Sequence, residues 1–242
     1  MRTALKLLLP VTLLLAAAAA QAAEPTFVRL DTEEGEILLV MYPDLAPNHV
    51  ANFTHLARTG FYDGSRFHRI VPGFVIQGGD PNSKDADPRN DGMGGPVMSD
   101  VLTDAEKAKV DEVNAMLEAK GYKGLDGPAN LKAEFSKTAH HLKGSLSMAR
   151  SRDVDSAGSQ FFICVDATPQ LDGQYTIFGH VVMGQDVADR IVSAEKNPSA
   201  GRDAPAVPVA ITKATVIEGT GHLTADEKAA WDAMDPTLKN VK

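Results

Sequence analysis

The chain has 242 residues, 43% of them hydrophobic, and a formal net charge of −8. This length allows one domain with a sizeable core and an appendage. The acidic balance, without any run of five basic residues, excludes nucleic acid as an expected partner.

The first 22 residues differ from the rest of the chain. Arg2 and Lys6 precede an apolar run over residues 7–19, and Ala20-Gln21-Ala22 fits the small-x-small cleavage rule. We therefore predict a signal peptide over residues 1–22, cleaved after about Ala22, and a periplasmic mature chain without membrane contact. A membrane anchor is the alternative, which the short, alanine-rich run disfavours.

Cys164 is the only cysteine, so the chain has no intrachain disulfide. It lies in the apolar run 161–165, and we predict a buried, unreactive thiol.

Short strands separated by glycine-rich turns dominate the chain from residue 26 onward. The turn at Glu33-Glu34-Gly35 separates strands over 27–30 and 36–40 and predicts a hairpin. Helical spacing predicts helices over residues 46–58 and 185–194. The further predicted strands cover residues 66–71, 75–78, 144–149, 160–165, 176–182 and 207–217. This pattern is typical of a closed antiparallel barrel, and counting periods leaves a sandwich nearly as compatible.

Residues 99–140 interrupt the strand pattern. Thr103 and Glu106 have capping-box spacing, and an amphipathic helix follows over residues 105–120. We expect this inserted helical segment to cover the flank of the barrel as a lid. The alternative is that it forms an accessory rim of a substrate groove.

A C-terminal helical tail is predicted over residues 219–242. Thr224 and Glu227 form a second capping-box pattern, and the helix that follows contains Trp231. Either the tail docks on the barrel or it frays in solvent, and a single tryptophan there is more typical of an anchor.

Four blocks of sequence carry a resemblance to a known family. They are residues 67–80 (FHRIVPGFVIQGGD), 144–150 (GSLSMAR), 158–164 (GSQFFIC), and Leu171-Asp172-Gly173 followed by Phe178-Gly179. In this order they resemble the cyclophilin family of peptidyl-prolyl cis-trans isomerases over residues 26–218, with one insertion. The resemblance implies a mainly β fold, a closed eight-stranded antiparallel barrel with two capping helices, and a groove on its outer wall.

The expected chemistry is rotation about an X–Pro bond, which resonance opposes with a barrier of about 18–20 kcal/mol. An enzyme accelerates it by stabilising the twisted state, in which the prolyl nitrogen becomes a better acceptor. The permanently charged guanidinium of Arg69 suits this role, and Gln77 is placed to hold it if the two strands form a hairpin.

The resemblance also implies the substrate-binding residues. Phe74, Met148, Phe162 and Leu171 are expected to line an apolar pocket for the proline ring. The amides of Gln77 and Gln160 and the main chain at Ala149 and Arg150 are expected to hold the peptide. Three positions depart from the common family pattern: Arg150 replaces an asparagine, Gln170 a tryptophan and Tyr175 a histidine.

We therefore predict a monomeric peptidyl-prolyl isomerase that acts on proline-containing exported polypeptides without cofactor or metal. A proline-peptide-binding module with little catalysis is the alternative. A metallohydrolase is disfavoured, because the adjacent His140 and His141 would diverge on a strand and no histidines have metal-site spacing.

Overall fold

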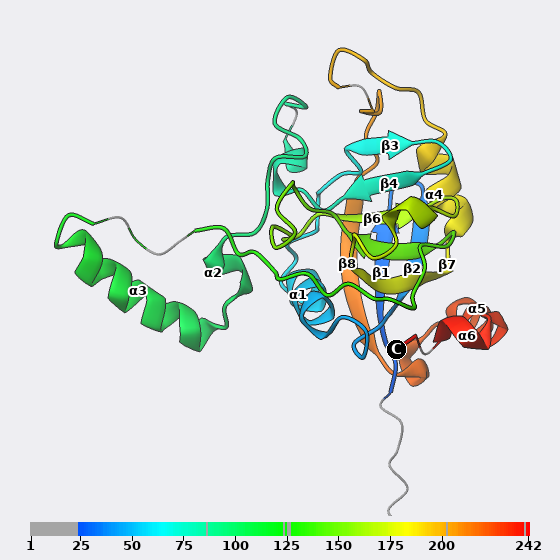
Figure 1. Cartoon of the computed structure of the whole chain (residues 1–242), viewed down its shortest axis with the longest axis horizontal. Helices are drawn as coiled ribbons and strands as arrows, with labels where there is room; N and C mark the ends of the chain where they lie inside the picture. The colour runs from blue at the N-terminus through cyan, green and yellow to red at the C-terminus, as the bar shows by residue number, and fades with distance from the viewer. Residues whose placement is uncertain (1–23, 86, 123, 125–126, 202, 240) are drawn as a thin grey trace, which may run out of the picture.

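The computed structural model describes residues 24–85, 87–122, 124, 127–201, 203–239 and 241–242 (Figure 1). The predicted signal peptide lies outside these residues. Within the described part of the chain, no helix is long and apolar enough to cross a membrane.

Eight antiparallel strands form one curled sheet in the order β3-β4-β6-β5-β7-β2-β1-β8. The strands are β1 (Thr26–Thr32), β2 (Gly35–Met41), β3 (Arg69–Val71), β4 (Val75–Gly78), β5 (Ser145–Met148), β6 (Phe161–Cys164), β7 (Ile177–Met183) and β8 (Ile211–Glu218). The helices are α1 (Pro47–Arg58), α2 (Met98–Val101), α3 (Asp104–Glu118), α4 (Gln185–Val192), α5 (Ala225–Ala233) and α6 (Pro236–Lys239). Three short 3-10 helices are η1 (Pro81–Lys84), η2 (Pro169–Leu171) and η3 (Thr220–His222).

The sheet is open, so the prediction of a closed barrel is wrong. β3 and β8 are its two edges and are not paired with each other, although the segments that precede them are bonded, as by Phe67 N–H to Val209 O at 3.0 Å. The chain entering β8 contains Pro205 and Pro208, which have no N–H to donate to a ladder. The regular pairing of β8 therefore begins only at Ile211, later than the predicted residue 207.

The concave side of the sheet and helices α1 and α4 enclose the main hydrophobic core. Phe53 of α1 packs against Phe161 of β6 and Phe178 of β7, with ring centroids 5.2 and 5.1 Å apart. Helix α4 buries Val187 and Ile191 in the same core. The two predicted helices are confirmed, since each buries the apolar face that its spacing indicated.

The C-terminal tail docks on the outside of β1 and β2. The Trp231 ring meets Phe27 edge-on at 5.0 Å, and Tyr42 Oη donates to Leu238 O at 2.6 Å. The buried carboxylate of Glu227 accepts from Arg29 Nη1 at 3.3 Å. Helices α5 and α6 therefore lie against the body, as Figure 1 shows.

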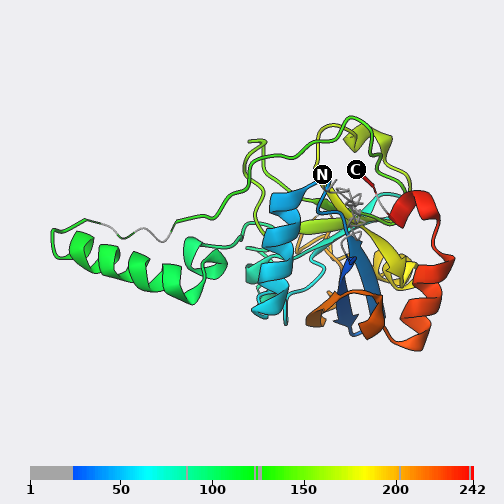
Figure 2. The same ribbon diagram turned by 90° about the horizontal axis from the view of Figure 1, so that it is seen from below.

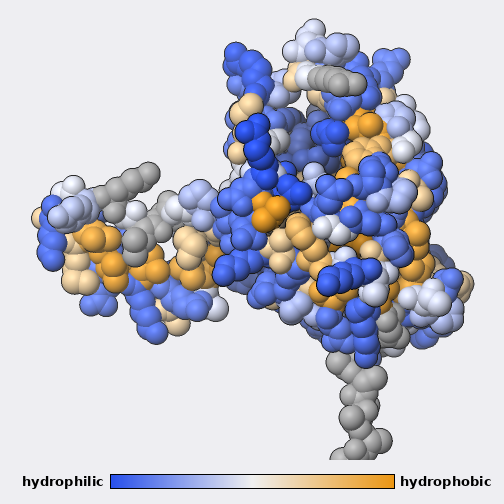
Figure 3. Space-filling view, in the orientation of Figure 1, coloured by the Kyte–Doolittle hydropathy of each residue, from blue (hydrophilic) through white to orange (hydrophobic). Residues whose placement is uncertain are grey.

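The predicted helix in the insertion is confirmed as α3, and Thr103 and Glu106 form its capping box. Its placement differs from the expected lid. Figures 1 and 2 show α3 projecting away from the sheet, and none of its residues is buried. Met116 and Val113 leave apolar surface exposed along it (Figure 3).

Candidate active site

A row of four side chains crosses the outer face of the sheet. Arg69 on β3 pairs with Gln77 on β4, Gln77 with Phe162 on β6, and Phe162 with Ser147 on β5. Residues paired in this way point to the same face of a sheet. The register therefore brings the predicted cation, amide and aromatic ring side by side on the convex wall.

The Arg69 guanidinium is held from two sides. Nη1 donates to Gln77 Oε1 at 3.3 Å, and Nη2 lies 3.5 Å from Asp203 Oδ2. Lys196 Nζ approaches the other oxygen of Asp203 at 3.1 Å. Asp203 was not predicted from the sequence, because its loop is rich in Pro, Gly and Ala and carries no motif. The loop is nevertheless fixed to the β3 edge, where Ile70 N–H donates to Asp203 O at 2.8 Å.

An apolar pocket of about 270 Å³ lies beside Arg69. Phe74, Phe162, Leu171 and Tyr175 form its hydrophobic wall, and Ala149 and Arg150 complete the rim. The rings of Phe162 and Tyr175 meet edge-on at 5.7 Å. These residues belong to a small cluster around Val75 and Cys164, separate from the main core.

Met148 does not line this pocket, so its predicted role is wrong. Its side chain is 1% exposed and lies in the main core with Leu146. Successive strand residues face opposite sides, so Ser147 takes the outer face next to Phe162 and Met148 points inward.

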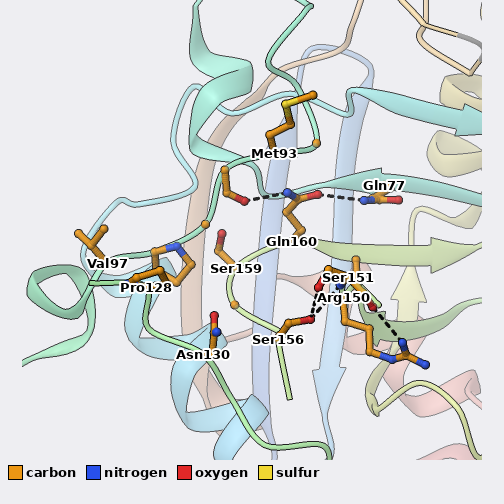
Figure 4. A pocket seen from close by; sticks show the side chains of 16 residues that line it. Gln77, Met93, Val97, Pro128, Asn130, Arg150, Ser151, Ser156, Ser159 and Gln160 are labelled. Carbon is orange, nitrogen blue, oxygen red and sulfur yellow. Dashed lines mark hydrogen bonds between the residues drawn. The ribbon is translucent and has the colours of Figure 1, made fainter. Parts of the chain in front are cut away.

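A second pocket of about 410 Å³, the loop pocket, adjoins the apolar pocket (Figure 4). Gln77, Ala149 and Arg150 line both pockets. Gln160 lies in the loop pocket, where its Oε1 accepts from Gln77 Nε2 at 2.9 Å and its Nε2 donates to Gly94 O at 2.8 Å. The two amides predicted to bind the substrate are thus also bonded to each other.

The carboxylate of Asp80 is fully buried behind the loop pocket, where it holds the loop that contains the pocket residues Gly92 and Gly94. It accepts from the backbone N–H of Asn82 at 2.8 Å, of Gly94 at 3.3 Å and of Gly92. A Cβ on Gly94 would stand 2.2 Å from Asp80 Oδ1, so only glycine fits there.

The chain just before the insertion and a stretch within it both contribute to the loop pocket. Val97, Pro128 and Asn130 lie on the pocket wall, and Figure 4 shows them on the side opposite Arg150. Backbone bonds join these two stretches, from Met98 N–H to Gly127 O and from Ala129 N–H to Pro96 O, both at 2.9 Å. The expected lid over the barrel flank is therefore not observed, and the alternative, an accessory rim of a substrate groove, stays a prediction.

Glu134, near the end of the insertion, caps helix α1. Its carboxylate accepts from the backbone N–H of Asn48 at 3.1 Å and of His49 at 3.0 Å, and from His49 Nδ1 at 2.7 Å. The N-cap residue Ala46 has no side-chain oxygen to offer. Burial raises the pKa of Glu134, but these hydrogen bonds outweigh it and the pKa is lowered.

Behind Phe162 lies a buried polar group that the sequence did not indicate. His141 Nε2 is 3.0 Å from Ser147 Oγ, and His141 Nδ1 is 2.9 Å from Asp172 Oδ1. His140 Nδ1 reaches the other oxygen at 2.7 Å, so the two histidines converge on one carboxylate, contrary to expectation. Despite burial, these bonds and the His141 N–H lower the pKa of Asp172 to about 2.

A substrate cannot reach the serine hydroxyl of this Ser147–His141–Asp172 arrangement. Ser147 is fully buried and its hydroxyl also lies 2.8 Å from Thr176 O, while the His141 ring stacks on Phe162 at 6.1 Å. The group supports the pocket wall from within. Cys164 is likewise sealed, and burial raises the pKa of its thiol to about 11, as expected of an unreactive cysteine.

The described residues contain no group of three or more His, Cys, Asp or Glu side chains that could hold a metal ion. What the site offers is a fixed cation beside an apolar pocket, on an open groove. Such an arrangement can hold a peptide and place a charged donor beside one of its amides, without a covalent step.

Comparisons with known proteins identify the family. The family model for the cyclophilin type peptidyl-prolyl cis-trans isomerase matches residues 27–216. A probable peptidyl-prolyl cis-trans isomerase of Brucella suis is 39% identical over 198 residues, covering 81% of this chain and 86% of that protein. A peptidyl-prolyl cis-trans isomerase of Schizosaccharomyces pombe is 36% identical, covering 78% of this chain and 98% of that protein.

Solved structures show the same fold. A cyclophilin type isomerase of Cryptosporidium parvum matches with a TM-score of 0.61 and 24% identity, covering 80% of this chain and 98% of that one. The chain therefore belongs to the cyclophilin-type peptidyl-prolyl cis-trans isomerases. Its relatives carry the name of an enzyme that fits EC 5.2.1.8, which confirms the enzymatic interpretation over a binding module.

Proposed function

We propose that Arg69 and Gln77 accelerate X–Pro rotation in exported, folding polypeptides whose proline ring occupies the apolar pocket. The observation that carries this mechanism is the position of Arg69, which borders the pocket while Gln77 holds its Nη1 at 3.3 Å. A guanidinium held there donates to the prolyl nitrogen when the amide twists and loses resonance. The stabilisation acts on the twisted state more than on either planar isomer.

Phe74, Phe162, Leu171 and Tyr175 supply the hydrophobic contact that selects proline, and the main chain at Ala149 and Arg150 binds the extended peptide. A related solved structure was determined in the presence of the dipeptide ala-pro, which supports a proline-containing ligand for this groove.

Arg69→Ala tests the mechanism. We expect kcat/KM for an X-Pro peptide to fall by about 10² or more, comparable to the loss of one preorganised donor in other enzymes. Arg66→Ala is the matched control, because Arg66 lies in the same segment but lines neither pocket. Circular dichroism monitors the fold of both variants. Activity of Arg69→Ala within twofold of the wild type would contradict the mechanism.

We infer export from residues 1–22, which have the sequence pattern of a signal peptide. When the full chain is expressed in a bacterial host, we expect the periplasmic fraction to contain a mature form that starts at about Ala23. N-terminal sequencing of that fraction tests it. A chain that retains Met1 and stays in the cytoplasm would contradict export.

A further inference from the structure

The charge on the groove differs from the charge of the whole chain. The chain has a net charge of −8, but no acidic side chain lies on the wall of either pocket among the described residues. The charged side chains on these walls are Arg69 and Arg150. On these two walls a bound peptide therefore meets two arginines and no carboxylate.

The two cations differ in their partners. Arg69 is paired with the carboxylate of Asp203. Arg150 bonds to neutral carbonyl oxygens, from Nε and Nη2 to Gln174 O at 3.2 and 2.9 Å and from Nη1 to Ser151 O at 3.0 Å. Its Cζ lies 4.5 Å from the centroid of the Tyr175 ring. None of the ion pairs among the described residues involves Arg150, so no carboxylate occupies its guanidinium directly.

These contacts fix Arg150 in advance of binding. A guanidinium has five N–H donors, and the contacts above use three of them, which leaves donors for a further acceptor. The ring and the two carbonyls hold the planar group in place, so little side-chain entropy is lost when a ligand arrives. A carboxylate is the acceptor that such a fork binds best.

The position of Arg150 determines which part of a peptide it meets. Arg150 is on the wall shared by the apolar pocket and the loop pocket. A peptide that places its proline in the apolar pocket and continues into the loop pocket must pass this residue. The side chain nearest Arg150 is then that of a residue flanking the proline.

We propose that Arg150 makes this enzyme selective for prolyl bonds flanked by an acidic side chain. The inference rests on the proposed placement of proline in the apolar pocket. It assigns the substrate class as peptides with Asp or Glu within two residues of the proline, and it makes Arg150 a specificity-determining residue.

The test compares matched peptides that carry Glu or Gln at one of the two positions before or after the proline. We expect wild type to prefer Glu about three- to tenfold in kcat/KM at one of these positions. Arg150→Gln should reduce this preference to below 1.5-fold. Because both peptides are measured on the same variant, a general loss of activity cancels in the ratio.

Arg152→Gln is the matched control, since Arg152 is an exposed arginine of the same loop that lines neither pocket. It should keep the wild-type preference. If Arg150→Gln turns over too slowly, calorimetric titration of the folded variant with the two peptides gives the same ratio as affinities. A wild-type preference below 1.5-fold at every position, or its loss in Arg152→Gln, overturns the proposal.

Failure of the inference is distinguishable from failure of the proposed function. If the apolar pocket is not the proline site, Phe162→Ala and Arg69→Ala retain turnover of the Gln peptides. If only the selectivity is wrong, those two variants lose turnover while the ratio of Glu to Gln peptides stays near one in wild type.

Discussion

Arg69 and Gln77 stand directly opposite each other on β3 and β4, and the guanidinium Nη1 donates to the amide Oε1 at 3.3 Å. Gln77 in turn donates to Gln160, and Gln160 donates to Gly94 O. The cation at the apolar pocket is thus the end of a hydrogen-bond chain that starts in the loop pocket. Disturbing either pocket therefore affects the position of Arg69.

The first prediction concerns Gln77→Ala. We expect kcat/KM to fall about tenfold, because the guanidinium loses the acceptor that fixes it beside the pocket. Gln174→Ala is the control, since the Gln174 side chain bonds to Gln170 O at 2.8 Å and lines neither pocket. Combining Gln77→Ala with Arg69→Ala should add little to the loss in Arg69→Ala. Fully additive losses would mean that Gln77 does not act through Arg69.

The second prediction concerns Asp203 as a positioning residue for Arg69. Removing its carboxylate frees one side of the guanidinium and also removes a negative charge. Lys196 already binds the other oxygen of Asp203 and offsets part of its negative charge. We therefore expect the loss of the guanidinium's fixed position to outweigh the gain from removing that charge. Asp203→Ala should lower kcat about three- to tenfold with KM nearly unchanged, and Asp203→Asn should recover part of the loss.

Steady-state kinetics on the Asp203 variants provide the measurement. Asp189→Ala serves as the control, because Asp189 makes a surface ion pair with Lys143 and lines neither pocket. An increase in kcat for Asp203→Ala would show that the carboxylate weakens the cation more than it orients it.

The third prediction concerns the cap that Glu134 places on α1. Glu134→Ala leaves the N–H groups of Asn48 and His49 without their acceptor, and we expect the free energy of unfolding to fall by about 1–2 kcal/mol. Urea denaturation measures this difference. Glu112→Ala on the exposed face of α3 is the control and should change stability by less than about 0.5 kcal/mol. Equal losses in both variants would argue against the cap.

The pairing of Arg69 with Gln77 was predictable from the sequence, because a short hairpin with alternating residues fixes which side chains face each other. The same rule shows why Met148 was misplaced. Met148 directly follows Ser147, and successive residues of a strand point to opposite faces of the sheet. Ser147 therefore faces the outer wall and Met148 faces the interior. Motif resemblance indicated that the residue belongs to the site region but not which way its side chain points.

Features that depend on distant loops were beyond sequence reasoning. Asp203 reaches Arg69 through a loop without a motif, and Glu134 reaches α1 across 85 residues of sequence. The group of buried Ser147 and His141 with partly exposed Asp172 is likewise assembled from separate segments. An amphipathic pattern predicted that α3 is a helix, but it did not indicate whether the apolar face would find a partner in this chain.

The last prediction concerns the dependence of stability on pH. Burial lowers the pKa of His180 to about 4, and burial also lowers the pKa of His49, His68 and His141. Between about pH 6.5 and pH 4 the unfolded chain therefore binds protons that the native chain does not. The free energy of unfolding should be level above about pH 7 and fall as the pH is lowered through this range.

Each histidine that stays neutral in the native state contributes a slope of about 1.4 kcal/mol per pH unit. Urea denaturation at several pH values measures the slope. His180→Gln should reduce the slope by the contribution of one histidine, about 1.4 kcal/mol per pH unit. His222→Gln, at an exposed position, is the control and should leave the slope unchanged. The carboxylate of Asp172, with a pKa of about 2, loses its contribution mainly below about pH 4, as the pH falls toward that value. A slope that is the same in wild type and His180→Gln would show that His180 is protonated in the folded chain.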